Sequence, residues 1–477
     1  MKKLYISFVV IMLSTISCNK DFGDININTK KPSEVPPEAL FAFATKSLIN
    51  EMTNANVNSN IFRLLAQQWT ETTYIDESNY DLTTRDIPQN FWNDIYLNVI
   101  KSLNESQRLI PLQVGLASKT VQANQDACIE ILNVYAYSVL VNTFGNIPYT
   151  EALNSDNVYP KYDDAATIYA DLLKRLDAAI TKIKDADAGF GANDLLYGGD
   201  MVGWKTFGYS LKLKLGMMLA DANPALAKTV VESASTHALT DNHDNVTFHY
   251  LSAPPNTNQI WVDLVQNGRG DFVAANTMVD AMIALNDPRM PLYFTKDSKG
   301  EYSGGIYAAN NSFATFSKPS TTITAPNFEA LFMDAAEVHF LLAEAAERGM
   351  TVSGTAQEHY DEGVKASIEY WGGSSADADT YLAQPSVNYA TAKGNYKEKI
   401  GVQKWLALYN RGFDAWTEWR RFDYPILTPP KNKTQADIPK RYTYPVQEQN
   451  LNTKNFNAAA IAVGGDNVKT KLFWDKF

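Results

Sequence analysis

Two stretches of the chain place aromatic side chains among amides, carboxylates and arginine. One lies between Trp69 and Asp86, and the other lies between Asn256 and Asp271. The candidate contact residues are Tyr74, Asp76, Asn79 and Tyr80 in the first stretch, and Asn258, Trp261, Asn267 and Arg269 in the second. Aromatic faces stack on the C–H faces of sugar rings, while amides, carboxylates and guanidinium groups bond to hydroxyls. These residue types predict a binding site for a ring-shaped, hydroxylated ligand, with Trp261 as the foremost contact.

Structural roles compete with this interpretation. Arg269 and Asp271 either contact a ligand or shape their own loop. Most of the other tryptophans fall on helical patterns and are expected in the core; these are Trp92, Trp204, Trp405, Trp416 and Trp419. Trp261 differs from them because amides and glycines surround it, and ligand contacts concentrate in such loops.

The residues that could carry catalysis or hold a metal do not form a known pattern. His237, His243 and His249 are spaced by six, which suits neither a helical nor a strand metal site, and His339 and His359 stand apart on helical faces. Nucleophile-elbow, phosphate-loop and dinucleotide motifs are absent from the sequence. Paired carboxylates for glycoside hydrolysis stay open, because the separation that they need is spatial. The sequence therefore predicts a binding protein with no catalytic residue, no metal and no cofactor.

The first residues resemble a signal for export. Lys2 and Lys3 precede an apolar stretch, Leu4 to Leu13, which is shorter than the roughly 20 residues of a spanning helix. Cys18 stands where cleavage is expected, which is typical of a bacterial lipoprotein whose cysteine receives a lipid. We therefore expect a signal peptide at 1–17, a lipid-anchored segment at 18–37 and a single domain at 38–477. The alternative is an ordinary secreted protein whose signal ends near a cysteine.

Composition narrows the possible partners. The formal net charge is -11 and basic blocks are absent, which disfavours nucleic acid. The only other cysteine, Cys128, lies in an apolar helical run and is expected in the core. Aromatic residues make up 12% of the chain, which suits either a stacking surface or a large helical core.

Helices are expected to position these residues. Apolar residues recur every three or four positions from Ala165 to Ile183, which predicts an amphipathic helix. The same spacing predicts a pair of helices at 335–349 and 356–371, joined by a short turn. That second unit has the size of a tetratricopeptide repeat, and 124–143 with 165–183 has a similar outline. Similar periodicity predicts further helices at 40–49, 61–69, 91–109, 204–219 and 328–348.

Two loop-rich insertions interrupt this mostly α, helical-repeat scaffold. They span about 241–276 and 297–325 and are rich in Asn, Ser, Gly, Pro and Thr. Loops of this length in a compact domain are usually functional. We expect them to form the ligand-binding face.

Short motifs along almost the whole chain point to a family. They are Phe144-Gly145-Asn146-Ile147-Pro148-Tyr149, Asn267-Gly268-Arg269-Gly270-Asp271-Phe272, Leu285-Asn286-Asp287-Pro288-Arg289, Gln403-Lys404-Trp405, Ala415-Trp416-Thr417-Glu418-Trp419-Arg420-Arg421 and Pro439-Lys440-Arg441-Tyr442-Thr443-Tyr444-Pro445. In this order, after a lipoprotein-type signal, they resemble the SusD/RagB family of nutrient-binding lipoproteins. Thr15 departs from the pattern, since leucine is commonest three residues before the lipidated cysteine.

The resemblance implies a fold, a location and a partner. It implies tetratricopeptide-like helix pairs, a lipid anchor on the outer face of the outer membrane, and action as the lid of a TonB-dependent SusC-like transporter. Family ligands are mostly oligosaccharides, whereas the RagB branch takes peptides. A helical envelope scaffold without a small ligand is a third possibility, against which the loop-rich insertions argue.

Overall fold

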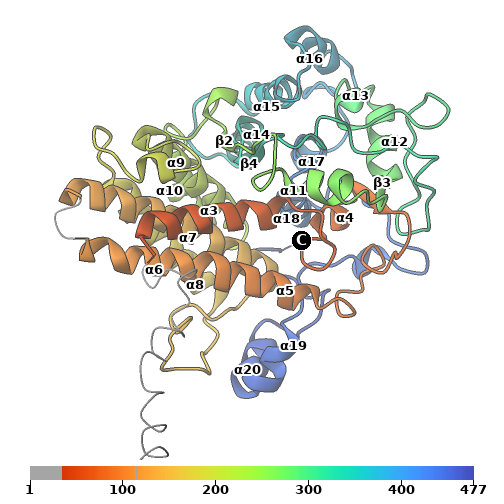
Figure 1. Ribbon diagram of the computed structural model, residues 1–477. Coiled ribbons are helices and arrows are strands. Elements are labelled where there is room, and N and C mark those ends of the chain that lie inside the picture. Colours follow the sequence, from red (N-terminus) through yellow and green to blue (C-terminus); the bar gives the residue numbers. More distant parts are fainter. Residues whose placement is uncertain (1–34, 114–116, 477) are drawn as a thin grey trace, which may run out of the picture.

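The computed structural model describes residues 35–113 and 117–476 (Figure 1). The predicted signal peptide, Cys18 and most of segment 18–37 lie outside these residues. The first described helix, α3, begins at Pro37.

Helices dominate the described chain, as predicted (Figure 1). In the first half they are α3 (Pro37–Thr53), α4 (Phe62–Leu65), α5 (Ile87–Asn93), α6 (Lys101–Leu109), α7 (Lys119–Phe144), α8 (Ala165–Lys182), α9 (Met201–Met218) and α10 (Pro224–Ala234). In the second half they are α11 (Gln259–Trp261), α12 (Asn276–Ala284), α13 (Met290–Tyr293), α14 (Ala335–Glu347), α15 (Ala356–Tyr370), α16 (Ser375–Leu382), α17 (Tyr396–Ala407), α18 (Gly412–Phe422), α19 (Val446–Leu451) and α20 (Thr453–Ala462).

Shorter elements complete the chain. Two π-helical segments, η1 (Asp94–Ile100) and η5 (Val262–Gln266), follow α5 and α11. The 3₁₀ turns are η2 (Ile110–Leu112), η3 (Gly191–Asn193), η4 (Asn242–Asp244) and η6 (Gln435–Asp437). The strands are β1 (Trp69–Glu71), β2 (Val246–Phe248), β3 (Phe272–Ala274) and β4 (Ala330–Met333). They form two antiparallel pairs, β1 with β3 and β2 with β4.

The expected helix pairs are present. α14 packs against α15 and α7 packs against α8, which confirms both predicted units. Local sequence defines their ends: Asp164 caps α8 by accepting from the Thr167 N–H, and Thr355 with Glu358 forms a capping box on α15. The scaffold is therefore a mostly α arrangement of tetratricopeptide-like helix pairs.

The core takes up most of the tryptophans and Cys128. Trp204, Trp405 and Trp416 are fully buried, and Cys128 is buried in α7. Among the described helices, only α7 is long and apolar enough to cross a membrane, and 94% of its most apolar window is buried inside the protein. That burial is typical of a central core helix.

Three expectations about elements were wrong. Residues 61–69 form only the short α4 before β1 begins, and residues 328–334 contain β4 rather than the start of a helix. Residues 61–70 are buried on every side, so their apolar spacing does not mark one helical face. The insertion at 241–276 is also not all loop, because it contains β2, α11, η5 and β3.

Candidate ligand-binding surface

The β1–β3 pair brings the two predicted stretches together. Trp69 pairs with Ala274 and Glu71 pairs with Phe272. The ladder continues past the strands, where the Thr72 N–H donates to the Asp271 carbonyl at 2.9 Å and its hydroxyl donates to the Gly270 carbonyl at 2.7 Å. The residues after β1 and those before β3 therefore leave the ladder side by side, on the right of Figure 1 near α4 and α12.

A third segment, from the insertion at 297–325, joins this ribbon. The Asn311 N–H donates to the Thr72 carbonyl at 3.0 Å, and its amide donates to the Glu71 carbonyl at 2.9 Å. The Ala308 N–H donates to the Thr70 hydroxyl at 3.1 Å. We call residues 72–86, 262–271 and 303–317 the loop face.

Two aromatic side chains are exposed on the loop face. Tyr74 is 74% exposed and has a left-handed backbone, with a φ of 55°. Phe313 is 42% exposed, and its ring lies so close to Gly270 that a Cβ there would come within 3.1 Å of it. The sequence analysis placed Phe313 in an insertion without singling it out. The signal that could have found it is an aromatic residue directly after Asn310, Asn311 and Ser312.

Solvent-exposed polar side chains lie on the same segments as these rings. The Arg269 guanidinium donates to the Asp271 carboxylate at 2.6 Å, and both side chains reach solvent. Asp76 and Asn267 are exposed, and the Asn267 amide has no hydrogen bond to another described side chain or backbone group. The loop face thus combines flat apolar surfaces with donors and acceptors.

Other predicted contact residues hold the loops instead. Asn258 is buried and caps α11: its oxygen accepts from the Ile260 N–H at 2.7 Å, and its amide donates to the Phe328 carbonyl at 2.7 Å. The Asn79 amide donates to the Ile75 and Ala308 carbonyls at 2.8 and 3.0 Å. Neither amide is turned toward solvent.

Tyr80 also lies below the surface. It is half-buried and packs against Ala275, Tyr307 and Ala308. Burial raises the pKa of Tyr80 well above its ordinary value. Its ring therefore supports the segment that carries Tyr74.

Trp261 lies in a helix rather than in a loop. It is the last residue of α11, is half-buried, and leads directly into η5. Its indole makes no hydrogen bond or ring contact with a described residue. Two residues later, Asp263 accepts from the Ala55 N–H at 3.2 Å, and burial raises its pKa. This contact fixes η5 against the end of α3, so that Trp261 stands at the start of the 262–271 segment.

A pair of buried carboxyl groups supports the loop face from below. Burial, followed by a hydrogen bond with Glu77, raises the pKa of Glu71 to about 9, so Glu71 is protonated at neutral pH. Glu71 Oε2 accepts a hydrogen bond from the Ser78 N–H at 3.0 Å, and Glu77 forms an ion pair with Arg85. This network holds residues 77–85 against β1.

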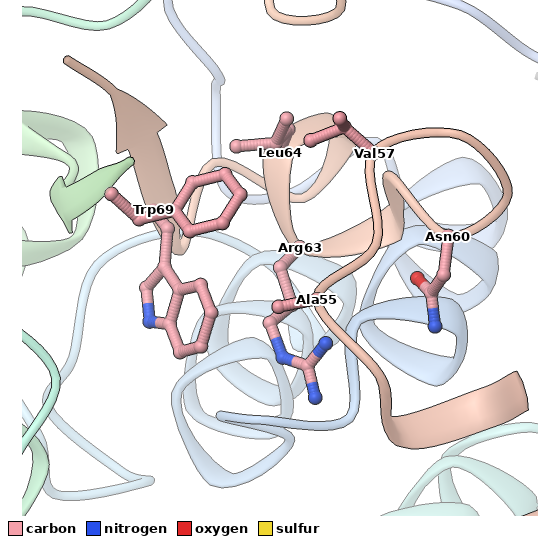
Figure 2. A pocket seen from close by; sticks show the side chains of 7 residues that line it. Ala55, Val57, Asn60, Arg63, Leu64 and Trp69 are labelled. Carbon is pink, nitrogen blue, oxygen red and sulfur yellow. The ribbon is translucent and has the colours of Figure 1, made fainter. Parts of the chain in front are cut away.

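The small cavity beside β1 is too narrow for a ligand (Figure 2). Its volume is about 10 Å³, which is about the room of one water molecule. Arg63 lines the cavity, with its guanidinium carbon 5.0 Å from the centre of the Trp69 ring. A ligand of the predicted kind does not fit in this cavity.

The described residues contain no group of three or more histidine, cysteine or acidic side chains placed to hold a metal ion. The loop face offers aromatic, amide and charged groups. Such a surface can bind a ligand by stacking and hydrogen bonding.

Comparison with known proteins places the chain in a family. A family model described as "Starch-binding associating with outer membrane", SusD-like, matches residues 29–445. A search of curated proteins gave no match.

Solved structures agree over nearly the whole length. A chitin-binding protein is 25% identical, with a TM-score of 0.80, and the match covers 92% of this chain and 100% of that one. A SusD homologue from Bacteroides uniformis is 25% identical, with a TM-score of 0.79 and coverages of 92% and 99%. A chitin-binding SusD homologue from Flavobacterium johnsoniae is 25% identical, with a TM-score of 0.76 and coverages of 92% and 97%. The chain therefore belongs to the SusD-like family.

Proposed function

We propose that this protein binds an oligosaccharide or polysaccharide on the loop face and passes it to a SusC-like, TonB-dependent transporter in the outer membrane. The observation that carries the proposal is that Tyr74, Phe313, Arg269 and Asn267 are exposed on segments that the β1–β3 ladder and Asn311 hold side by side. Rings that stack on sugars and groups that bond to hydroxyls are both present there.

The relatives support this ligand class. The family model is described as starch-binding, and two of the similar structures are of chitin-binding proteins. Anchoring through a lipid on Cys18, exposure at the cell surface and partnership with the transporter complete the proposal. They rest on the signal-like sequence and on the family.

In the second candidate function, the same surface binds a peptide, as in the RagB branch. The exposed Arg269 and Asp271 favour it, since a charged pair can also bind a peptide's charged groups. A protein that only holds envelope components together is the third candidate, and it predicts no small ligand at all.

Binding to glycans tests these candidates directly. The soluble form from Asn19 onward is run in native gels that contain starch, glycol chitin or another polysaccharide. We expect one glycan to retard it, and we expect Tyr74→Ala and Phe313→Ala each to weaken binding about tenfold, which corresponds to about 1.4 kcal/mol for one stacked ring. Trp261→Ala tests the contact that the sequence favoured most.

A matched control separates stacking from a general effect of losing a tyrosine. Tyr159 is 60% exposed but lies beside α20, where its carbonyl accepts from Asn455. Tyr159→Ala should leave retardation unchanged. Retardation by no glycan, together with peptides in material co-purified from membranes, contradicts the carbohydrate proposal and favours the peptide.

A further inference from the structure

A pair of buried histidines joins α14 to α15. His339 and His359 are each 8% exposed, and their Nδ1 atoms are 3.2 Å apart. The sequence analysis expected the two rings to stand apart on separate helices. The packing of α14 on α15 brings them together.

The two Nδ1 atoms point directly at each other. The ring centres are 5.5 Å apart and the two Nδ1 atoms are 3.2 Å apart. The first distance exceeds the second by about two ring radii, one for each imidazole. Both nitrogens therefore lie on the line between the ring centres, and so do their in-plane lone pairs or protons. A metal ion on this line needs about 4 Å between the nitrogens, because a metal–nitrogen bond is about 2.0 Å. The spacing fits a hydrogen bond.

The outer nitrogens face backbone carbonyls. His339 Nε2 lies 3.0 Å from the Thr240 oxygen, and His359 Nε2 lies 2.5 Å from the Ser353 oxygen. A carbonyl oxygen only accepts, so each Nε2 must carry a proton to make a hydrogen bond.

Counting protons gives the charge of the pair. Two carbonyl contacts and one contact between the rings need three ring protons, whereas two neutral imidazoles carry two. With only two protons, one of the three contacts brings two hydrogen-bond acceptors together without a proton between them, which is unfavourable because both atoms are buried. With three protons, every contact is a hydrogen bond and the pair carries one positive charge.

The contact lengths identify which ring holds the charge. His359 Nε2 lies closer to its carbonyl than His339 Nε2 does, at 2.5 against 3.0 Å, and the closer carbonyl dipole better stabilises a positive ring. Burial lowers the pKa of His339. His339 is therefore the neutral acceptor, and His359 is the donor on both sides.

The charged groups around the two histidines favour a positive charge on the pair. A cavity of about 220 Å³ opens beside His339, and its other titratable lining residues are Asp241, His243, Glu362, Lys365 and Glu369. Glu358 precedes His359 on α15, and hydrogen bonds from Thr355 lower its pKa. The first turn of α15 opposes a cation, and these carboxylates offset that effect.

We propose that His339 and His359 form a site that binds one proton between two helices and stays singly charged at neutral pH. The bound proton cross-links the loop at Thr240, α14, and the turn at Ser353 that leads into α15. This site does not depend on the identity of the ligand.

Nuclear magnetic resonance of the ring nitrogens tests the proposal. The soluble form from Asn19 onward is labelled with ¹⁵N in its five histidines. At about pH 7.5, one unit above the ordinary histidine pKa of about 6.5, we expect His359 to have protons on both nitrogens. His237, His243 and His249, which are exposed, serve as references in the same spectrum. Two neutral buried rings at that pH overturn the proposal.

Two variants show whether the partner ring is the cause. His339→Leu removes the acceptor, so the His359 ring should lose its second proton and become neutral at pH 7.5. His243→Leu, which changes another histidine beside the same cavity, should leave His359 charged. An unchanged His359 titration in His339→Leu also overturns the proposal, and the wild-type spectrum stands if the variant does not fold.

Discussion

At the scale of single residues, exposure separates the aromatic side chains by role. Trp405 and Trp416 are fully buried, whereas Tyr74 and Phe313 reach solvent on the loop face. The sequence predicted the buried tryptophans well, because helical periodicity reports which side chains face a core. It missed Phe313 and overrated Asn258, because neither the capping of α11 nor the approach of residues 303–317 to β1 is a local property of the sequence.

Glu71 makes the free energy of unfolding depend on pH between about 4.5 and about 9. Its pKa is raised from 4.5 to about 9 by burial, so between these values the folded chain holds a proton that the unfolded chain has lost. Stability therefore falls as the pH rises from about 4.5 to about 9. Glu71→Gln keeps the acceptor for Ser78 and removes the titration, so we expect it to raise the free energy of unfolding near pH 8 by on the order of 2 kcal/mol.

Urea denaturation between pH 5 and 9 measures this effect. The difference between Glu71→Gln and the wild type should grow with pH. Asp76→Asn is the control, because Asp76 is an exposed carboxylate of the same segment. A constant difference at all pH values would contradict a protonated Glu71.

At the scale of elements, the sequence predicted helices better than strands. The pairs α7–α8 and α14–α15 connect neighbours in sequence, and their apolar stripes and caps are readable locally. β1 and β3 are three-residue strands about 200 residues apart, and no local pattern pairs Trp69 with Ala274. The approach of His339 to His359 was also hidden, because it depends on how two predicted helices rotate against each other.

Asn311 is expected to hold one third of the loop face in place. Its amide donates to the carbonyls of Glu71, Ile306 and Ala309 at 2.9, 3.0 and 2.7 Å. Asn311→Ala leaves the buried Glu71 carbonyl and two part-buried carbonyls without this donor and should cost about 1–3 kcal/mol. Asn310→Ala, which changes an exposed neighbour, should be neutral.

Limited proteolysis and glycan retardation distinguish the two variants. We expect Asn311→Ala to be cut faster within residues 303–317 and to bind glycan more weakly, because Phe313 loses its support. Equal cutting rates would show that the segment is held by other contacts.

At the scale of the whole molecule, the C-terminal segment closes over the helical core. The Trp474 indole donates to the Asn142 side chain of α7 at 3.0 Å, and Arg420 donates to the Asn142 and Lys440 carbonyls at 2.8 Å. Arg441 reaches Asp466 at 2.7 Å. These arginines bind distant parts of the chain together.

Trp474→Ala should therefore destabilise the entire protein. The side chain is 2% exposed and lies 4.8 Å from the guanidinium of Arg420, so its loss should cost about 3–5 kcal/mol. Ile461→Ala, in the same C-terminal region, should cost almost nothing because Ile461 is 80% exposed. Thermal unfolding followed by circular dichroism compares them, and equal midpoints would contradict a structural role for the C-terminal segment.

The pairing of Trp69 with Ala274 also sets an order of events during folding. Closing a loop of about 200 residues costs conformational entropy before the contacts at its ends repay it, so long-range pairs form late. Individual helix pairs can be complete while the β1–β3 ribbon is still open. A chain in which this ribbon is still open thus has no assembled loop face, so the three segments of that face come together only at the end of folding.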